Sequence, residues 1–187
     1  KNEAVFDLFF RQRDNSAYAI MAGTESVIDY INKLHFAPED IEYLRSLNLF
    51  DEGFLKILAD MRFTGEIYGM PEGTVVFPYE PLIRVKAPIM QAQLVETTLL
   101  NLVNHQTLIA TKAARVAYAA NGDGVMEFGL RRAQGPDAGI YGARAAMIGG
   151  CTGTSNVLTG QMCGVPVSGT HAHSWVMSFP TELDAFR

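Results

Sequence analysis

The segment that decides the fold runs from Val125 to Ile148 and reads VMEFGLRRAQGPDAGIYGARAAMI. Residues 125–130 are apolar enough for a buried strand, a polar loop follows them, and residues 139–148 predict a helix. A strand, a loop and a helix in that order form the repeating unit of parallel α/β proteins. We therefore expect this part of the chain to be α/β.

The same pattern repeats toward the C-terminus. We expect a second strand or loop at 151–157, a short helix near 158–162, a third strand from 165–167 and some helix within 174–186. A barrel of this kind closes with eight strands, so three strands predict the opening part of a barrel or an open sheet. The NGDG turn precedes this segment, and 12 of the 17 glycines lie after residue 121, so the C-terminal third is built differently from the rest.

The residues before this turn predict another organisation. Residues 1–87 predict an α+β unit. We expect its strands at 4–11, 17–22, 67–70, 74–77 and 82–85, with a turn at 13–16 that makes the first two strands a hairpin. We expect its helices at 25–34 (N-capped by Thr24), from Pro38 and at 52–62. A long helix follows at 89–119, and its only charges are Glu96, Lys112 and Arg115, which predicts burial by several neighbours. The predicted segments are 1–87, 88–121 (the helical connector) and 122–187.

Composition limits the class of protein. The 187 residues are 48% hydrophobic and 19% charged, which is enough apolar material to fill a core and excludes a disordered chain. The net charge of −5 gives no reason to expect a nucleic-acid partner. The N-terminus lacks a signal-peptide pattern and no 18-residue apolar window occurs, so we expect a cytoplasmic protein without a membrane span. The first residue is Lys1 rather than Met, which suggests a fragment.

Polar residues gather in the three loops that follow the predicted C-terminal strands. The loops read RRAQGPD (131–137), GGCTGTSN (149–156) and SGTHAHS (168–174). Loops at the carboxyl ends of parallel strands meet at one edge, where α/β proteins carry their sites. Arginine forks match carboxylate and phosphate oxygens, and glycine loops let backbone N–H groups approach an anion. We expect an anion site with a histidine at its edge.

Several of these features have simpler interpretations. Gly149-Gly150 fits the end of a helix equally well, and the two arginines fit surface ion pairs. Cys151 and Cys163 fit small core residues and match no zinc pattern. On a strand, His171 and His173 would point to opposite faces, so one of them would be structural. As a pair they would also suit a metal-dependent barrel hydrolase, although no third ligand lies nearby in the sequence, and we predict no metal site.

Six segments, in order along the chain, match one family. They are Phe6–Arg11, Glu72–Thr74, Leu99–Ala114, Glu127–Asp137, Gly153–Leu158 and Gly169–Ser174. Together they resemble nicotinate phosphoribosyltransferase over essentially the whole chain. The resemblance implies a small α/β sandwich packed against an irregular α/β barrel, the type II phosphoribosyltransferase arrangement, and usually a homodimer.

The resemblance also implies a reaction. The family joins nicotinate to phosphoribosyl pyrophosphate, with Mg²⁺, giving nicotinate mononucleotide and pyrophosphate in NAD salvage, and couples ATP hydrolysis through a phosphohistidine. By position in the matched motifs, the phosphorylated residue is His173, and the substrate contacts are Thr170, Phe128, Arg131, Arg132 and Ser155.

Ser155 separates the two closest alternatives. Relatives that use nicotinamide carry an acid at this position, and an acid would repel the nicotinate carboxylate, whereas a hydroxyl can donate to it. The alternative of a nicotinamide phosphoribosyltransferase is therefore disfavoured. Family members are about twice as long as this chain or longer, so we expect no turnover from these 187 residues alone. A non-enzymatic remnant that only binds or oligomerises is a further alternative.

Overall fold

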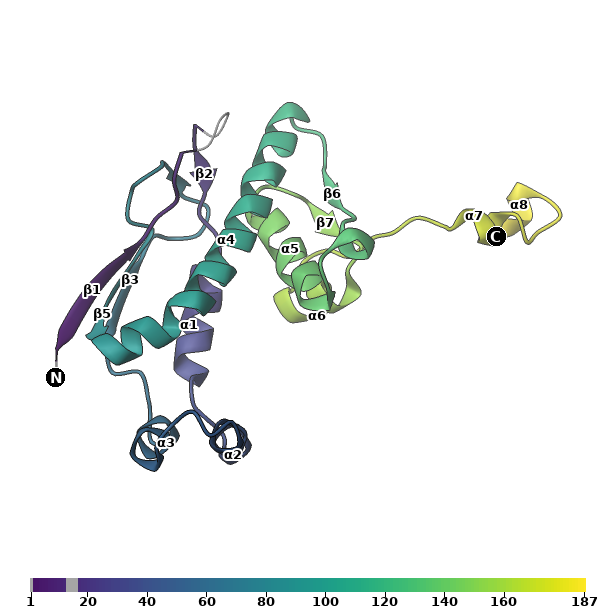
Figure 1. Ribbon diagram of the computed structural model, residues 1–187. Helices are drawn as coiled ribbons and strands as arrows, with labels where there is room; N and C mark the ends of the chain where they lie inside the picture. The colour runs from purple at the N-terminus through teal and green to yellow at the C-terminus, as the bar shows by residue number, and fades with distance from the viewer. Residues whose placement is uncertain (1, 13–16) are drawn as a thin grey trace. The chain divides into compact units, whose positions relative to one another are not determined.

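The computed structural model describes residues 2–12 and 17–187 (Figure 1). The chain forms two compact units, Lys1–Thr111 and Lys112–Arg187, and helix α4 (Ile89–Ala119) begins in the first and ends in the second. The turn expected at 13–16 lies outside the described residues. The division into 1–87, 88–121 and 122–187 stays a prediction, because both units share α4. Within the described ranges, no helix is both long and apolar enough to cross a membrane.

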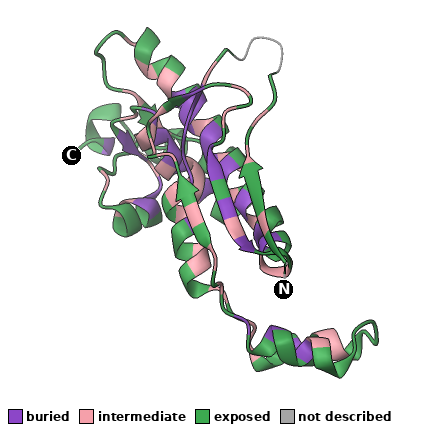
Figure 2. Cartoon of the chain, turned by 90° about the vertical axis from the view of Figure 1, so that its left-hand side faces the viewer, coloured by how far each residue is buried: buried purple, intermediate pink, exposed green. Residues whose placement is uncertain are grey.

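Three antiparallel strands, β1 (Glu3–Leu8), β5 (Ile83–Pro88) and β3 (Glu66–Gly69), lie side by side in that order in the first unit. Every second residue of the central strand β5, starting at Ile83, is buried, and the residues between them are more exposed. This is the two-residue period of a strand with one face on a core. Figure 2 shows the outer strand β1 mostly exposed.

A second antiparallel pair joins β2 (Ala19–Ile20) to β4 (Val75–Val76). The expected hairpin between 17–22 and the first strand is therefore wrong, because β1 pairs with β5 instead. The reason lies in α4: the whole of β2 is buried, and the buried Thr111 hydroxyl accepts a hydrogen bond of 2.9 Å from the Ile20 N–H. A strand enclosed in this way does not fit at the open edge of a sheet.

The three helices expected in this unit are confirmed. They are α1 (Thr24–Lys33), α2 (Pro38–Ser46) and α3 (Glu52–Ala59). The N-cap of α1 is Gly23, with φ +106°, rather than the expected Thr24. The Thr24 hydroxyl is used elsewhere, since it donates to the carbonyl oxygen of Met70 at 2.9 Å. The ring Nδ1 of His35, just past α1, donates to the Lys33 carbonyl oxygen at 2.7 Å, as a residue that closes a helix end would.

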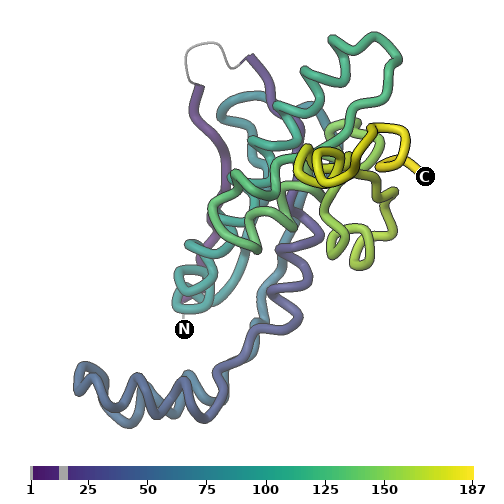
Figure 3. Tube along the Cα trace, turned by 90° about the vertical axis from the view of Figure 1, so that its right-hand side faces the viewer, coloured from purple at the N-terminus to yellow at the C-terminus, as the bar shows by residue number. Residues whose placement is uncertain are grey.

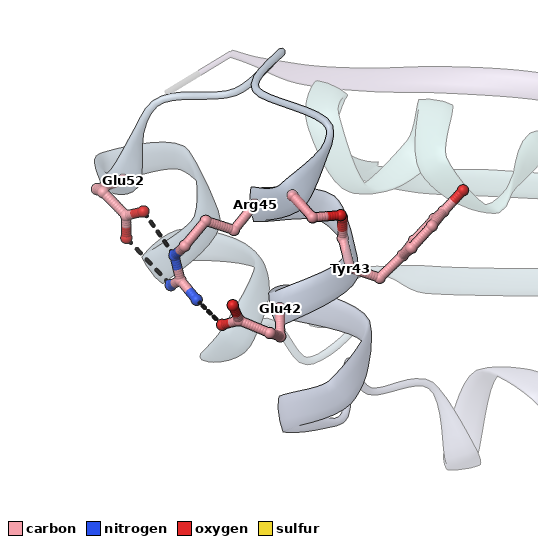
Figure 4. A network of polar contacts seen from close by, with 5 residues as sticks. Glu42, Tyr43, Arg45 and Glu52 are labelled. Atoms are coloured by element: carbon pink, nitrogen blue, oxygen red, sulfur yellow. Dashed lines mark hydrogen bonds and ion pairs between the residues drawn. The ribbon is translucent and has the colours of Figure 1, made fainter.

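Helices α2 and α3 follow α1 along the chain and lie together as a pair, as the trace in Figure 3 shows. Arg45 of α2 donates to both carboxylate oxygens of Glu52 in α3, at 2.6 and 3.1 Å, and to Glu42 at 2.5 Å (Figure 4). These two carboxylates raise the pKa of the Arg45 guanidinium. The same two helices share a small apolar cluster of Ile41, Leu55 and Leu58.

Helix α4 spans the predicted residues. Its apolar side packs on the sheet through Val95, Leu99 and Val103, all buried. Other apolar side chains on it are open to solvent: Leu108 is 63% exposed and Tyr118 is 89% exposed. The predicted burial from several sides is therefore not met by the described residues, which cover one side of this helix.

The second unit follows the strand–loop–helix order that the sequence predicted. Its elements are β6 (Met126–Glu127), the 3-10 turn η1 (Leu130–Arg132), α5 (Pro136–Ile148), β7 (Gly153–Thr154), α6 (Val157–Cys163), α7 (His173–Val176) and α8 (Glu182–Ala185). β6 and β7 are parallel, and Thr154 forms a further parallel bridge to Val167. The predicted parallel arrangement is confirmed, with strands shorter than expected.

Candidate functional site

Backbone hydrogen bonds align the three parallel segments of the second unit. The Ser155 N–H donates to the Glu127 carbonyl at 3.0 Å, and the Ser168 N–H donates to the Thr154 carbonyl at 3.1 Å. The first residue after each segment is therefore Phe128, Ser155 or Ser168. Because the segments are parallel, these residues leave the sheet at the same edge, which is where α/β folds place their sites.

A pocket of about 320 Å³ opens at this edge. It is lined by Phe128, Leu130, Arg131, Ser155 and Thr170, which come from all three loops. Four of these five are residues that the sequence predicted as substrate contacts. The lining combines an aromatic face, a guanidinium and two hydroxyls, groups that suit a flat ring carrying an anionic substituent.

The adjacent arginines separate in the structure. Arg131 and Arg132 both lie on η1, but only Arg131 belongs to the described pocket lining. A 3-10 turn rotates the chain by a third of a circle per residue, so neighbouring side chains point in different directions. Both arginines are exposed, and the structure brings Arg131 to the pocket while Arg132 lies outside the described lining.

Leu130 is a lining residue that the sequence did not single out, because it was expected inside the strand. Its side chain lies against Gly139 of α5: a Cβ built on that glycine would come within 2.5 Å of Leu130 Cδ1. The glycine thus leaves the space that Leu130 occupies. In the sequence, the feature that corresponds to this contact is the apolar Leu130 followed by Gly139 within the next helix.

The carboxylate of Glu127, outside the described pocket lining, contacts residues next to those that line the pocket. One oxygen of Glu127 accepts from the Gly129 N–H, and the other accepts from the hydroxyl of Thr154 at 2.6 Å. The Thr154 oxygen in turn accepts from the Asn156 N–H at 3.0 Å. The Asn156 side-chain oxygen caps α6 by accepting from the Thr159 N–H at 3.2 Å. Its Nδ2 is buried without a hydrogen-bond partner among residues 2–12 and 17–187.

The two histidines of the third loop do not lie on a strand. His173 is exposed and is the first residue of α7, and the exposed His171 packs its ring edge-on to Phe186, with centroids 5.2 Å apart. The expected alternation of these histidines across a strand is therefore wrong. Neither histidine belongs to the described pocket lining.

The arrangement of possible metal ligands gives the hydrolase alternative no support. In the part of the chain that the structure describes, no three His, Cys, Asp or Glu side chains are grouped to hold a metal ion. We therefore assign no residue of this chain to Mg²⁺.

The cysteines are both free thiols within the described ranges. Cys151 is half-buried, and burial, together with the nearby Glu127 carboxylate, raises the pKa of its thiol. Cys163 is exposed, so the expectation of a core residue is wrong for it. It is the last residue of the short helix α6, whose burial falls mainly on Thr159.

A larger hollow of about 470 Å³ lies in the first unit, lined by Tyr68, Gly69, Met70, Pro81 and Arg84. Its charged lining residue, Arg84, already donates to both carboxylate oxygens of Asp7, at 2.7 and 2.8 Å. An anion arriving there would have to compete with this carboxylate. The pocket of the second unit is the better candidate site, because no carboxylate contact is seen at Arg131 among the described residues.

Comparison with known proteins gives consistent results. Residues 1–104 match the family model of the nicotinate phosphoribosyltransferase N-terminal domain. A nicotinate phosphoribosyltransferase of Bacillus subtilis is 47% identical over 188 residues, covering 100% of this chain and 38% of that protein. One from Mycobacterium tuberculosis is 46% identical over 184 residues, covering 98% of this chain and 40% of that protein.

Solved structures agree with these sequence matches. The crystal structure of human nicotinic acid phosphoribosyltransferase superposes with a TM-score of 0.86 at 39% identity, over 95% of this chain and 36% of that one. A nicotinate-nucleotide pyrophosphorylase from Pyrococcus furiosus superposes with a TM-score of 0.76 at 26% identity, over 98% of this chain and 40% of that one. The mixed helix and sheet fold is that of type II phosphoribosyltransferases, as predicted.

The chain thus spans about 40% of the length of the curated relatives it matches. The family model covers more than half of the chain, and the relatives align over nearly all of it. This chain belongs to the nicotinate phosphoribosyltransferase family.

Proposed function

We propose that the protein carrying this chain joins nicotinate to phosphoribosyl pyrophosphate, forming nicotinate mononucleotide and pyrophosphate in NAD salvage. The observation that carries the proposal is the single pocket lined by Phe128, Arg131, Ser155 and Thr170. The relatives that match nearly the whole chain bear the name of this activity. The complete protein carries the proposed activity, since the chain spans only part of their length.

Each lining group has a task that its chemistry supports. The exposed face of Phe128 offers a surface on which the pyridine ring stacks. The Arg131 guanidinium matches the two oxygens of the nicotinate carboxylate, and such paired charge-assisted hydrogen bonds fix orientation as well as affinity. The hydroxyls of Ser155 and Thr170 add donors at the rim of the same pocket.

The same groups favour an acid over an amide. A carboxylate accepts at both oxygens and donates at neither, so a pocket of donors suits it throughout. Nicotinamide would turn a donating amide group toward a guanidinium, which has no acceptor. Ser155, a hydroxyl rather than an acid, supports nicotinate over nicotinamide as the substrate.

The reaction depends mainly on how the two substrates are positioned. The bond from ribose C1′ to the pyrophosphate oxygen breaks, the bond from C1′ to the pyridine nitrogen forms, and pyrophosphate leaves with the electron pair. Positive charge develops on the ribose as the bond breaks, so catalysis rests on holding the nitrogen in line and on stabilising the separated charges. Phe128 and Arg131 hold the ring for this step.

The residue proposed to take a phosphoryl group from ATP is His173. Its side chain is exposed at the first residue of α7, where a phosphoryl group can reach it. A phosphohistidine adds negative charge, which rearranges the loop beside it through new hydrogen bonds. Mg²⁺ stays in the proposal as an ion carried by the phosphates of the substrates, since diphosphates bind it commonly. The homodimer and the cytoplasmic location also stay predictions.

A product assay tests the proposed function. The protein expressed from its complete gene is given phosphoribosyl pyrophosphate, ATP and equal concentrations of nicotinate and nicotinamide, and the mononucleotides are separated by chromatography. We expect nicotinate mononucleotide to exceed nicotinamide mononucleotide at least tenfold, the effect of roughly one lost charge-assisted interaction. Equal products or an excess of the amide product contradicts the proposal.

A further inference from the structure

We propose that Glu127 is a positioning residue of this pocket, because its carboxylate ties the turn that carries Phe128 and Arg131 to the turn that carries Ser155. The inference rests on the proposed function, since the pocket is taken to hold nicotinate. Glu127 is half-buried and does not belong to the described pocket lining, so it acts through its neighbours rather than on the substrate.

The first contact is local. A carboxylate oxygen of Glu127 accepts from the N–H of Gly129, two residues further on. This hydrogen bond closes a small ring that contains the backbone of Phe128 and ends the strand at Glu127. The next hydrogen bond along the chain, from the Arg132 N–H to the Gly129 carbonyl at 2.9 Å, forms η1. The turn that presents Phe128 and Arg131 therefore begins at Gly129, whose N–H is held by this carboxylate.

Gly129 leaves room for the same contact. A Cβ built on Gly129 would lie 2.8 Å from the accepting oxygen of Glu127, closer than such atoms approach in proteins. A larger residue at Gly129 would push the carboxylate away.

The second contact crosses to the neighbouring strand. Glu127 and Thr154 are register partners in the β6–β7 pair, and the Thr154 hydroxyl donates to the other carboxylate oxygen at 2.6 Å. Thr154 is fully buried, and its oxygen accepts from the Asn156 N–H at 3.0 Å. Ser155 lies between these two residues, so its backbone is held from both sides.

Pocket residues and network residues alternate along both turns. Phe128 lies between Glu127 and Gly129, and Ser155 lies between Thr154 and Asn156. A carboxylate suits this place because both of its oxygens accept and neither donates. With glutamine, the amide nitrogen faces either the Gly129 N–H or the Thr154 hydroxyl, so one of these two donors loses its acceptor while the size of the side chain is unchanged.

Three variants of the protein expressed from its complete gene test this role. Glu127→Gln keeps the shape and removes one acceptor. Thr154→Val removes the tie between strands together with the acceptor of the Asn156 N–H, and Thr154→Ser keeps the hydroxyl for both contacts. Thr152→Val is the matched control: Thr152 lies just before β7, and its hydroxyl donates at 3.2 Å to the carbonyl of Val125, just before β6, rather than to Glu127. Steady-state kinetics give kcat and the KM of each substrate, and thermal unfolding gives Tm.

We expect Glu127→Gln and Thr154→Val to raise the KM for nicotinate by about fivefold or more, with the KM for phosphoribosyl pyrophosphate changed less than about twofold. Thr154→Ser should recover most of the loss, and Thr152→Val should leave the KM for nicotinate unchanged. A residue that only stabilised the fold would lower Tm without this selective rise in KM.

Three results would overturn the inference: an unchanged KM for nicotinate in Glu127→Gln, an equal rise in both KM values, or no recovery in Thr154→Ser. If one variant fails to fold, the comparison of Thr154→Ser with the remaining one decides the outcome in the same way. A wild-type protein that makes no nicotinate mononucleotide contradicts the proposed function itself, and the role of Glu127 toward nicotinate falls with it.

Discussion

Thr107 of α4 and Ala22, which follows β2, exchange two hydrogen bonds. The Thr107 hydroxyl donates to the Ala22 carbonyl at 3.0 Å and accepts from the Ala22 N–H at 3.2 Å. Both residues are buried. A helix side chain here satisfies the backbone of an extended segment as a neighbouring strand would. The Thr111 hydroxyl makes the accepting half of such a contact, from the Ile20 N–H.

Removing this hydroxyl should destabilise the protein. Thr107→Val keeps the shape of the side chain but leaves a buried N–H and a buried carbonyl without partners, which costs roughly 2 to 4 kcal/mol. Thr107→Ser keeps the hydroxyl and should cost about 1 kcal/mol or less, the effect of one lost methyl group. Urea unfolding followed by circular dichroism measures both. Equal stabilities for the two variants would show that the hydrogen bonds contribute nothing.

Gly23 gives a second test of the junction between α1 and α4. Its φ is +106°, and a Cβ there would lie 2.9 Å from the Leu102 carbonyl oxygen. Gly23→Ala should cost roughly 2 to 5 kcal/mol, combining the left-handed backbone with the overlap. Gly73 is the control, because its φ is +84° but a Cβ there meets no described atom within 4 Å. Gly73→Ala should cost about 1 to 2 kcal/mol by the same measurement; a Gly23→Ala cost no larger than this would contradict the close approach.

The Asp7–Arg84 pair predicts a dependence on pH. Its hydrogen bonds hold the pKa of the Asp7 carboxyl below the ordinary value of 3.8. A carboxyl group whose pKa is lower in the folded state stabilises the fold at pH values above its unfolded-state pKa. This stabilisation is lost as the pH falls through the pKa of the folded state. NMR titration of the Asp7 carboxyl should show its pKa rising in Arg84→Met and staying low in Lys86→Met, a neighbouring cation on the same strand. An unchanged Asp7 pKa in Arg84→Met would count against the pair.

His173 predicts a covalent label. When the protein expressed from its complete gene is incubated with ATP labelled in the γ-phosphate, acid-labile label should appear on the protein. His173→Ala should lose it, and His171→Ala, which changes the histidine packed on Phe186, should keep it. Autoradiography after electrophoresis under alkaline conditions measures the label. Label that persists in His173→Ala and disappears in His171→Ala would move the role to the other histidine.

Much of the second unit could be predicted from the sequence because its order is local. Each strand is followed at once by its loop and helix, and parallel strand ends meet at one edge, so Phe128, Arg131, Ser155 and Thr170 come together without knowledge of distant contacts. The strand lengths could not be predicted, because β6 ends where the Glu127 carboxylate accepts from the Gly129 N–H.

The errors concern contacts between residues far apart in the chain and the local geometry of two short helices, η1 and α7. The partner of β2 depends on the hydroxyls of Thr107 and Thr111 in α4, and nothing near β2 in the sequence indicates them. Arg131 and Arg132 are equivalent as sequence, and only the turn of η1 separates them. His173 begins the helix α7, where the sequence predicted the end of a strand.

The separation of the two arginines tests the central claim, that this pocket holds nicotinate, most directly. Isothermal titration of nicotinate into the wild-type protein, Arg131→Ala and Arg132→Ala gives three values of Kd under one set of conditions. We predict that Arg131→Ala weakens binding about 10- to 100-fold, the effect of a lost charge-assisted pair, and that Arg132→Ala changes Kd less than about threefold, as expected of an exposed charge outside the pocket. Equal effects of the two substitutions, or a Kd unchanged by Arg131→Ala, would contradict the account.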